Sequence, residues 1–217
     1  MWRDHMEGRM NKRTAIHDRV LNATDKEDLA AAYAEWADAY DHDLLDDLGY
    51  VAPQVAAGML AEQMNRPDAL ILDAGCGTGI VGALLCASGY RQIDGLDYSQ
   101  RMLDKASEKA AYTNLSQGDL MSPLPIPDDR YDAVISVGTF TCAHVGPQAL
   151  NELVRITRPG GCLCFTVRDQ AWHEENYRAV IDDITSRGMW RRIEERTTPY
   201  IEKEGSECVV CLYEVTS

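Results

Sequence analysis

The fold of this chain is decided by the stretch Leu70-Ile71-Leu72-Asp73-Ala74-Gly75-Cys76-Gly77-Thr78-Gly79. An apolar run suited to a buried strand leads into an acidic residue and three glycines at alternate positions, and an apolar helical pattern follows. Such a unit holds a nucleotide-like ligand against backbone at the carboxyl edge of a parallel sheet. Glycines suit the loop because, without a Cβ, they adopt positive φ and let a ligand approach closely. The alternative is a tight turn that binds no ligand.

Strands and helices alternate from residue 70 onward. Strands are expected at 70–73, 92–97, 114–117, 131–137 and 162–167, with helices at about 79–88, after Ser99, at 147–157 and at 171–187. Two further strand-like runs, at 190–198 and 207–215, close the chain. This order predicts an α/β fold with a mostly parallel sheet, helices on both faces and a final antiparallel hairpin.

The residues before the glycine loop divide into two parts. Residues 1–23 are polar and lack periodicity, which predicts a mobile N-terminal arm. A capping box at Thr24 starts a helix with the apolar stripe Leu29, Ala32, Tyr33, Trp36, Ala37 and Tyr40, and a second helix follows at about 53–64. We assign residues 24–66 to a helical cap and 67–217 to the main domain. The aromatic stripe must bury against the flank of the sheet or close over a ligand.

The composition argues against several classes of protein. The net charge of −14, from 35 acidic and 21 basic residues, is a poor footprint for a nucleic-acid binder, so no nucleic-acid partner is expected. No apolar run reaches membrane-spanning length and no secretory signal is visible, so we expect no membrane partner and a cytoplasmic location. Seven scattered cysteines do not form a disulfide framework. Cys208 and Cys211 lack a second pair or a histidine cluster, so they are expected to be buried thiols and not metal ligands.

A second acid follows the next strand along the same sheet edge. Asp97 ends the strand at 92–97, and it lies 24 residues after Asp73. A carboxylate in this place can accept hydrogen bonds from two vicinal ribose hydroxyls. Alternatively, Asp97 supports the N-terminus of the helix that follows.

These motifs resemble class I S-adenosylmethionine-dependent methyltransferases over about residues 68–168. The D-x-G-x-G-x-G loop is similar to their first motif, whereas the dinucleotide fingerprint of an NAD enzyme would need a glycine in place of Ile80. Gly118-Asp119-Leu120 is similar to the family segment that contacts the adenine edge, although an Asx-turn is the alternative for Asp119. The run at 131–136 and the Pro159-Gly160-Gly161 turn resemble the fourth strand and the turn before the fifth.

A further resemblance lies before the core, where residues 33–41 are similar to a segment of the methyltransferase-like protein of the Williams-Beuren syndrome region. The family resemblance implies a Rossmann-like sheet of seven strands in the order 3-2-1-4-5-7-6, with strand 7 antiparallel. It implies S-adenosylmethionine as the cofactor. The cofactor-binding residues that we expect are Tyr33, Trp36, Tyr40, Asp73, Ala74, Gly75, Gly77, Gly79, Asp97, Tyr98, Met102, Asp119, Leu120 and Ser136.

The expected activity is methyl transfer to a small-molecule acceptor that the sequence does not identify. Transfer from a sulfonium needs mainly positioning, and His144 is either a general base or an ordinary loop histidine. The run Ser136-Val137-Gly138-Thr139 lacks the [DN]-P-P-[FY] motif of methyltransferases that act on exocyclic base or amide nitrogens. A non-catalytic cofactor-binding partner protein and a protein methyltransferase are the alternatives.

Overall fold

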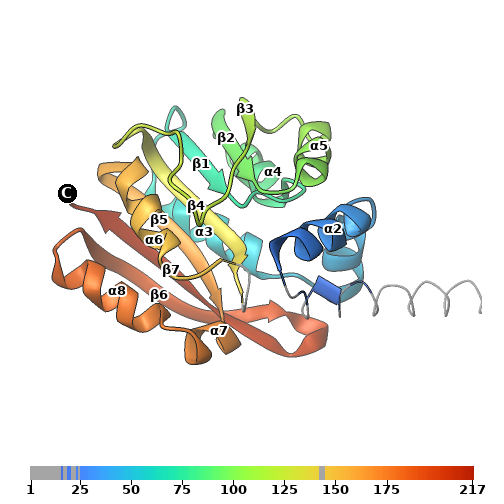
Figure 1. The fold of residues 1–217 in the computed structure, drawn as a ribbon. Coiled ribbons are helices and arrows are strands. Elements are labelled where there is room, and N and C mark those ends of the chain that lie inside the picture. The colour runs from blue at the N-terminus through green and yellow to red at the C-terminus, as the bar shows by residue number, and fades with distance from the viewer. Residues whose placement is uncertain (1–15, 17–18, 21–22, 24, 142–144) are drawn as a thin grey trace, which may run out of the picture.

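The computed structural model describes residues 16, 19–20, 23, 25–141 and 145–217. Seven strands form one sheet in the order β3-β2-β1-β4-β5-β7-β6 (Figure 1). They are β1 (Leu70–Ala74), β2 (Gln92–Asp97), β3 (Asn114–Gln117), β4 (Tyr131–Phe140), β5 (Thr157–Arg168), β6 (Trp190–Ile201) and β7 (Ser206–Val215). Strands β1 to β5 are parallel, and β7 is antiparallel to β5 and β6. The predicted strand order and the antiparallel strand 7 are confirmed.

Helices cover both faces of the sheet (Figure 1). They are α2 (Lys26–Trp36), α3 (Ala52–Gln63), α4 (Ile80–Ala87), α5 (Gln100–Glu108), α6 (Ala149–Ile156), α7 (Asp169–Glu174) and α8 (Tyr177–Ser186). A π-helical turn, η1 (His42–Leu48), and a 3-10 turn, η2 (Glu202–Glu204), complete the elements. Neighbouring strand residues point to opposite faces, so Ile71 joins the core under α3 and α4 while Leu72 joins the core under α6 and α8. Among the described residues, no helix is both long and apolar enough to cross a bilayer.

The helix expected over 171–187 is wrong as a single element. Helix α7 ends at Glu174, Glu175 is extended, and α8 begins at Tyr177. The break turns the chain so that the buried Tyr177 ring packs 5.8 Å from the ring of Phe140. The Tyr177 hydroxyl also donates to the carbonyl of Val145 at 2.5 Å.

The cap helix is shorter than its apolar stripe predicts. The N-cap is Asp25, whose carboxylate accepts from the amide of Asp28 at 2.8 Å, so the capping box placed at Thr24 is wrong by one residue. Helix α2 ends at Trp36, and a turn follows at residues 37–39. The Trp36 indole N–H donates to the buried carboxylate of Asp43 at 2.9 Å.

Four described residues fall in the arm predicted at 1–23. Among them, Arg19 pairs with Asp28 at 2.6 Å, and Val20 is buried against the cap. The mobility of the arm stays a prediction.

The C-x-x-C pair lies on the penultimate strand of the sheet order. Cys208 and Cys211 are three residues apart, so they point to opposite faces of β7 and join different cores. Both are buried free thiols, as the sequence predicts.

Candidate active site

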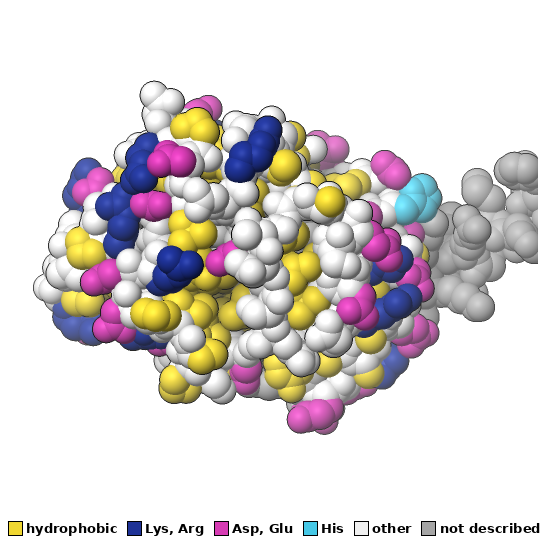
Figure 2. All heavy atoms as spheres, turned by 90° about the horizontal axis from the view of Figure 1, so that it is seen from above, with side chains coloured by type: hydrophobic (Ala, Val, Ile, Leu, Met, Phe, Trp, Pro, Cys, Tyr) yellow, Lys and Arg dark blue, Asp and Glu magenta, His cyan; other side chains and the backbone are white. Residues whose placement is uncertain are grey.

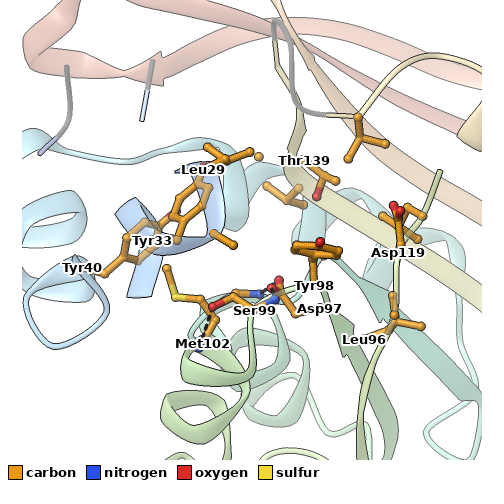
Figure 3. Close-up of a pocket in the computed structure, with 18 residues that line it drawn as sticks. Leu29, Tyr33, Tyr40, Leu96, Asp97, Tyr98, Ser99, Met102, Asp119 and Thr139 are labelled. Carbon is orange, nitrogen blue, oxygen red and sulfur yellow. Dashed lines mark hydrogen bonds between the residues drawn. The ribbon is translucent and has the colours of Figure 1, made fainter. Parts of the chain in front are cut away.

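One cavity lies where the carboxyl ends of β1, β2 and β4 meet α2. It encloses about 850 Å³ of space, including the solvent at its open mouth. Its lining is Leu29, Ala30, Tyr33, Tyr40, Gly75, Gly77, Leu96, Asp97, Tyr98, Ser99, Met102, Gly118, Asp119, Leu120, Val137, Gly138, Thr139 and Val145. Figure 3 shows Leu29 and Tyr33 of the cap on one side of this cavity and Asp119 on the other.

The glycine loop forms part of the cavity wall and is tied to the end of β2. The amides of Gly75 and Cys76 donate to the carbonyl of Leu96 at 2.7 and 3.0 Å. Gly75 has a φ of 77°, and a Cβ there would lie 2.3 Å from Oγ1 of Thr139. Glycine is therefore needed at position 75 for both the backbone conformation and the packing. At Gly77 a Cβ would meet nothing within 4 Å, so its Cα faces open space.

Asp97 connects the glycine loop to helix α5. Its Oδ2 accepts from the amide of Gly77 at 2.8 Å, and its Oδ1 accepts from the amide of Ser99 at 2.9 Å. Ser99 is the N-cap of α5, as predicted, so Asp97 does support this helix. Burial raises the pKa of the Asp97 carboxyl, which borders the cavity. A carboxylate has about four lone-pair positions, so it can still accept hydrogen bonds from a ligand.

Asp119 makes the Asx-turn that was its alternative interpretation. Its Oδ1 accepts from the amide of Met121 at 2.9 Å. The same residue lines the cavity together with Leu120. The turn fixes the direction of the Asp119 carboxylate. Asp119 can therefore make this hydrogen bond within the turn and still line the cavity.

Nine of the predicted site residues come together around this cavity. They are Tyr33, Tyr40, Gly75, Gly77, Asp97, Tyr98, Met102, Asp119 and Leu120. Tyr98 is 41% exposed, whereas Met102 is buried, and both line the cavity. Tyr98 therefore lies at the solvent-exposed edge of the cavity, and Met102 contributes apolar surface to its wall.

The other five predicted residues lie outside the cavity lining. Trp36 points toward a neighbouring cavity, and Gly79 is packed against Ala106 and Tyr112. Ala74 and Ser136 are fully buried, with the Ser136 hydroxyl donating to the Ala74 carbonyl at 2.7 Å. The Ser136 side chain therefore connects β4 to β1 by a hydrogen bond.

Asp73, the fifth of these residues, is a buried acid beneath the glycine loop. Its Oδ2 accepts from the Tyr112 hydroxyl at 2.7 Å, and its Oδ1 has no hydrogen-bond partner among the described residues. Burial raises the pKa of its carboxyl to about 7, against the lowering effect of the Tyr112 hydrogen bond.

The sequence did not predict Gly138 and Thr139 as site residues; they line the cavity near the end of β4, where its register with β5 shifts. The φ of 74° at Gly138 is the kind of feature that a glycine inside a strand pattern indicates. His144 lies outside the described residues, so its role stays a prediction.

The site can be compared with known proteins. A family model described as a methyltransferase domain matches residues 71–161. The chain is 38% identical over 184 residues to human Methyltransferase-like protein 27, covering 81% of this chain and 74% of that protein. The chain belongs to the class I S-adenosylmethionine-dependent methyltransferases. The family resemblance inferred from the motifs is confirmed.

Other relatives of this methyltransferase are more distant. It is 31% identical over 153 residues to the Malonyl-[acyl-carrier protein] O-methyltransferase of Serratia marcescens, covering 70% of this chain but only 56% of that protein. The TehB-like S-adenosylmethionine-dependent methyltransferase from Corynebacterium glutamicum has a TM-score of 0.63 at 20% identity, covering 86% and 99% of the two chains. A putative methyltransferase in complex with the Haloferax volcanii Trm112 activator gives 0.64 at 19%, covering 85% and 98%. These two structures show the fold alone.

The cofactor of this methyltransferase is S-adenosylmethionine, and the cavity fits it. Asp97 offers a carboxylate that two ribose hydroxyls can share, and Leu96, Met102 and Leu120 supply apolar surface for a base. The open space at Gly77 permits close approach to backbone.

We expect Asp97→Ala to weaken binding of S-adenosylhomocysteine, the demethylated product, by about 1.5–3 kcal/mol, because ribose hydroxyls lose a charged acceptor. The melting temperature should also fall, since the Gly77 and Ser99 amides lose their partner. Calorimetry and thermal unfolding measure the two effects. Ser99→Ala, which removes the helix cap and keeps the carboxylate, is the control. Unchanged affinity in a folded Asp97→Ala protein would show that Asp97 only supports the fold.

A second prediction concerns the pH dependence of stability. Because the folded pKa of Asp73 is about 7 and its ordinary value is 3.8, ionisation of this carboxyl lowers stability progressively between pH ~4 and ~7. The stability of Asp73→Asn relative to the unsubstituted protein should therefore increase as the pH rises from ~4 to ~7, and the gain should level off above pH ~7. Melting temperatures across this range measure the gain, and the exposed Asp104→Asn controls for net charge. A gain that shrinks with rising pH would contradict the assignment.

Proposed function

We propose that this methyltransferase acts on a small-molecule acceptor. The observation that carries the proposal is a second cavity, which shares Tyr33, Tyr40 and Gly138 with the cofactor cavity. It encloses about 430 Å³ including its mouth and lies under the cap. A pocket beneath the cap can be reached by a small molecule or the end of a chain, whereas a folded protein or a duplex needs an open surface.

The charge of the protein agrees with this acceptor class. A net charge of −14 disfavours the approach of phosphate backbones. Over the described residues of the face in Figure 2, basic side chains lie among acidic ones and form no broad basic surface. The buried free thiols, Cys208 among them, also agree with a cytoplasmic location, which we include in the proposal.

The proposed roles of the residues follow from their places in the cavity. S-adenosylmethionine supplies a methyl group already activated on a positively charged sulfur, so the protein mainly has to orient the acceptor and exclude water. Asp97 would hold the ribose, Asp119 and the amide of Leu120 would contact the adenine edge, and the glycine loop would approach the methionine part. Tyr33 and Tyr40 would close the site from the cap.

The cap is held over the cavity by ion pairs to the α5 region. Asp38 lies 2.8 Å from Arg101 and 3.0 Å from Lys105, and Asp41 lies 2.5 Å from Lys109. The Asp38 contacts are solvent-exposed and contribute little each, so they set the position of the cap more than its stability.

The test separates cofactor binding from transfer. We expect micromolar binding of S-adenosylmethionine and S-adenosylhomocysteine and no binding of NAD by calorimetry. With methyl-labelled cofactor and a cell extract split by ultrafiltration, label should appear in the small-molecule fraction, and the Asp97→Ala protein is the negative control. Label confined to the protein fraction would indicate a protein methyltransferase. Cofactor binding with no transfer to either fraction would indicate a non-catalytic protein.

A further inference from the structure

The second cavity is lined by four tyrosines and one arginine, and we call it the tyrosine pocket. Its polar residues are Tyr33 and Tyr40 from the cap, Tyr50 before α3, Thr141 after β4, Arg168 at the end of β5 and Tyr200 in β6. Among the described residues, Val20, Trp36, Leu44, Gly138 and Ile201 form the rest of the lining. Segments far apart in the chain therefore build one pocket beside the cofactor cavity.

Two tyrosine hydroxyls converge where the pocket meets the cofactor cavity. The hydroxyls of Tyr50 and Tyr200 lie 3.4 Å apart, and their rings pack edge to face at 5.0 Å. A Cβ on Gly138 would lie 2.4 Å from the Tyr50 hydroxyl and 3.2 Å from that of Tyr200. Because Gly138 lines both cavities, these hydroxyls face the junction between them.

Arg168 is the one basic side chain among the described residues that line either cavity. Its side chain is 18% exposed, and its guanidinium lies 5.6 Å from the centre of the Tyr200 ring. It donates to Glu204 at 3.3 Å. A guanidinium carries five N–H donors, so this ion pair leaves most of them available to a ligand.

The tyrosines add hydrogen-bond donors to this cation. Burial raises the pKa of Tyr33, Tyr40, Tyr50 and Tyr200, so all four phenols stay neutral at physiological pH. Neutral phenols can donate to an anionic oxygen, and their rings offer apolar surface. A cation with neighbouring hydroxyl donors suits a carboxylate and is unfavourable for an amine, which would be charged at this pH.

We propose that the tyrosine pocket is the acceptor subsite and that the acceptor is a carboxylic acid whose carboxylate pairs with Arg168. The apolar body of the acid lies against the tyrosine rings, and its other end reaches the junction at Gly138. This inference rests on the proposed function, because it assumes a small-molecule acceptor. The alternative is that Arg168 only ties β5 to η2 through Glu204.

The test measures binding to the protein saturated with S-adenosylhomocysteine, so it does not depend on turnover. The probes are phenylacetate and hexanoate, each compared with its neutral amide. The variants are Arg168→Gln and Arg168→Lys. Arg191→Gln is the matched control, since it removes one cation from an exposed pair with Glu214 on the same sheet. Calorimetry and ligand-observed NMR give the affinities.

We expect the carboxylates to bind about tenfold or more tightly than the amides. Arg168→Gln should weaken carboxylate binding to the level of the amides, while Arg191→Gln leaves it unchanged. Affinity for S-adenosylhomocysteine should stay within about twofold in all variants. If Arg168→Gln does not fold, Arg168→Lys still decides, because it keeps the charge but loses the paired N–H geometry and should bind carboxylates several-fold more weakly.

Three results would overturn the proposal. One is that neither carboxylate binds better than its amide. Another is that carboxylate affinity survives in folded Arg168 variants. The third is that these variants lose S-adenosylhomocysteine and keep the carboxylates, which would place the cofactor's own carboxylate on Arg168. None of these results depends on cofactor binding by the unsubstituted protein or on methyl transfer to metabolites in the extract. Those two measurements therefore test the proposed function separately.

Discussion

The site depends on the two hydrogen bonds that the Asp97 carboxylate accepts from the backbone. One comes from Gly77 in the glycine loop at 2.8 Å, and the other from Ser99 at the start of α5 at 2.9 Å. They add to the parallel pairing of β1 with β2, which extends to Ala74 and Leu96, and to the bonds of the Gly75 and Cys76 amides to the Leu96 carbonyl. The Asp97 carboxylate also borders the cavity. A ligand that binds to it therefore contacts the same group that holds the glycine loop in place.

The cofactor cavity lies between the strand ends and the cap, and different interactions hold these two sides in place. On the sheet side, buried contacts such as the Ser136 hydrogen bond to Ala74 fix β4 beside the glycine loop. On the cap side, Trp36 anchors α2 through Asp43, while exposed ion pairs connect it to α5. Tyr33 and Tyr40 of the cap line both the cofactor cavity and the tyrosine pocket.

The sequence predicts the sheet and the floor of the site because both are local. Gly75 and Gly77 follow β1 and Asp97 ends β2, so the neighbouring places of these strands bring the three residues together. The tyrosine pocket was not predicted, since Tyr50 and Tyr200 are 150 positions apart and no motif connects them. Apolar periodicity placed Trp36 correctly in the interior. It could not show that the indole faces the neighbouring cavity, because a stripe gives a face of a helix and not its neighbours.

A crystal structure of the protein with S-adenosylhomocysteine tests the central claim most directly. Our account predicts both ribose hydroxyls within hydrogen-bond distance of the Asp97 carboxylate while the Gly77 and Ser99 amides keep their bonds to it. It also predicts the adenine beside Asp119 and Leu120, and the tyrosine pocket left free of the ligand. A nucleoside bound away from Asp97, or a methionine part lying on Arg168, would contradict it.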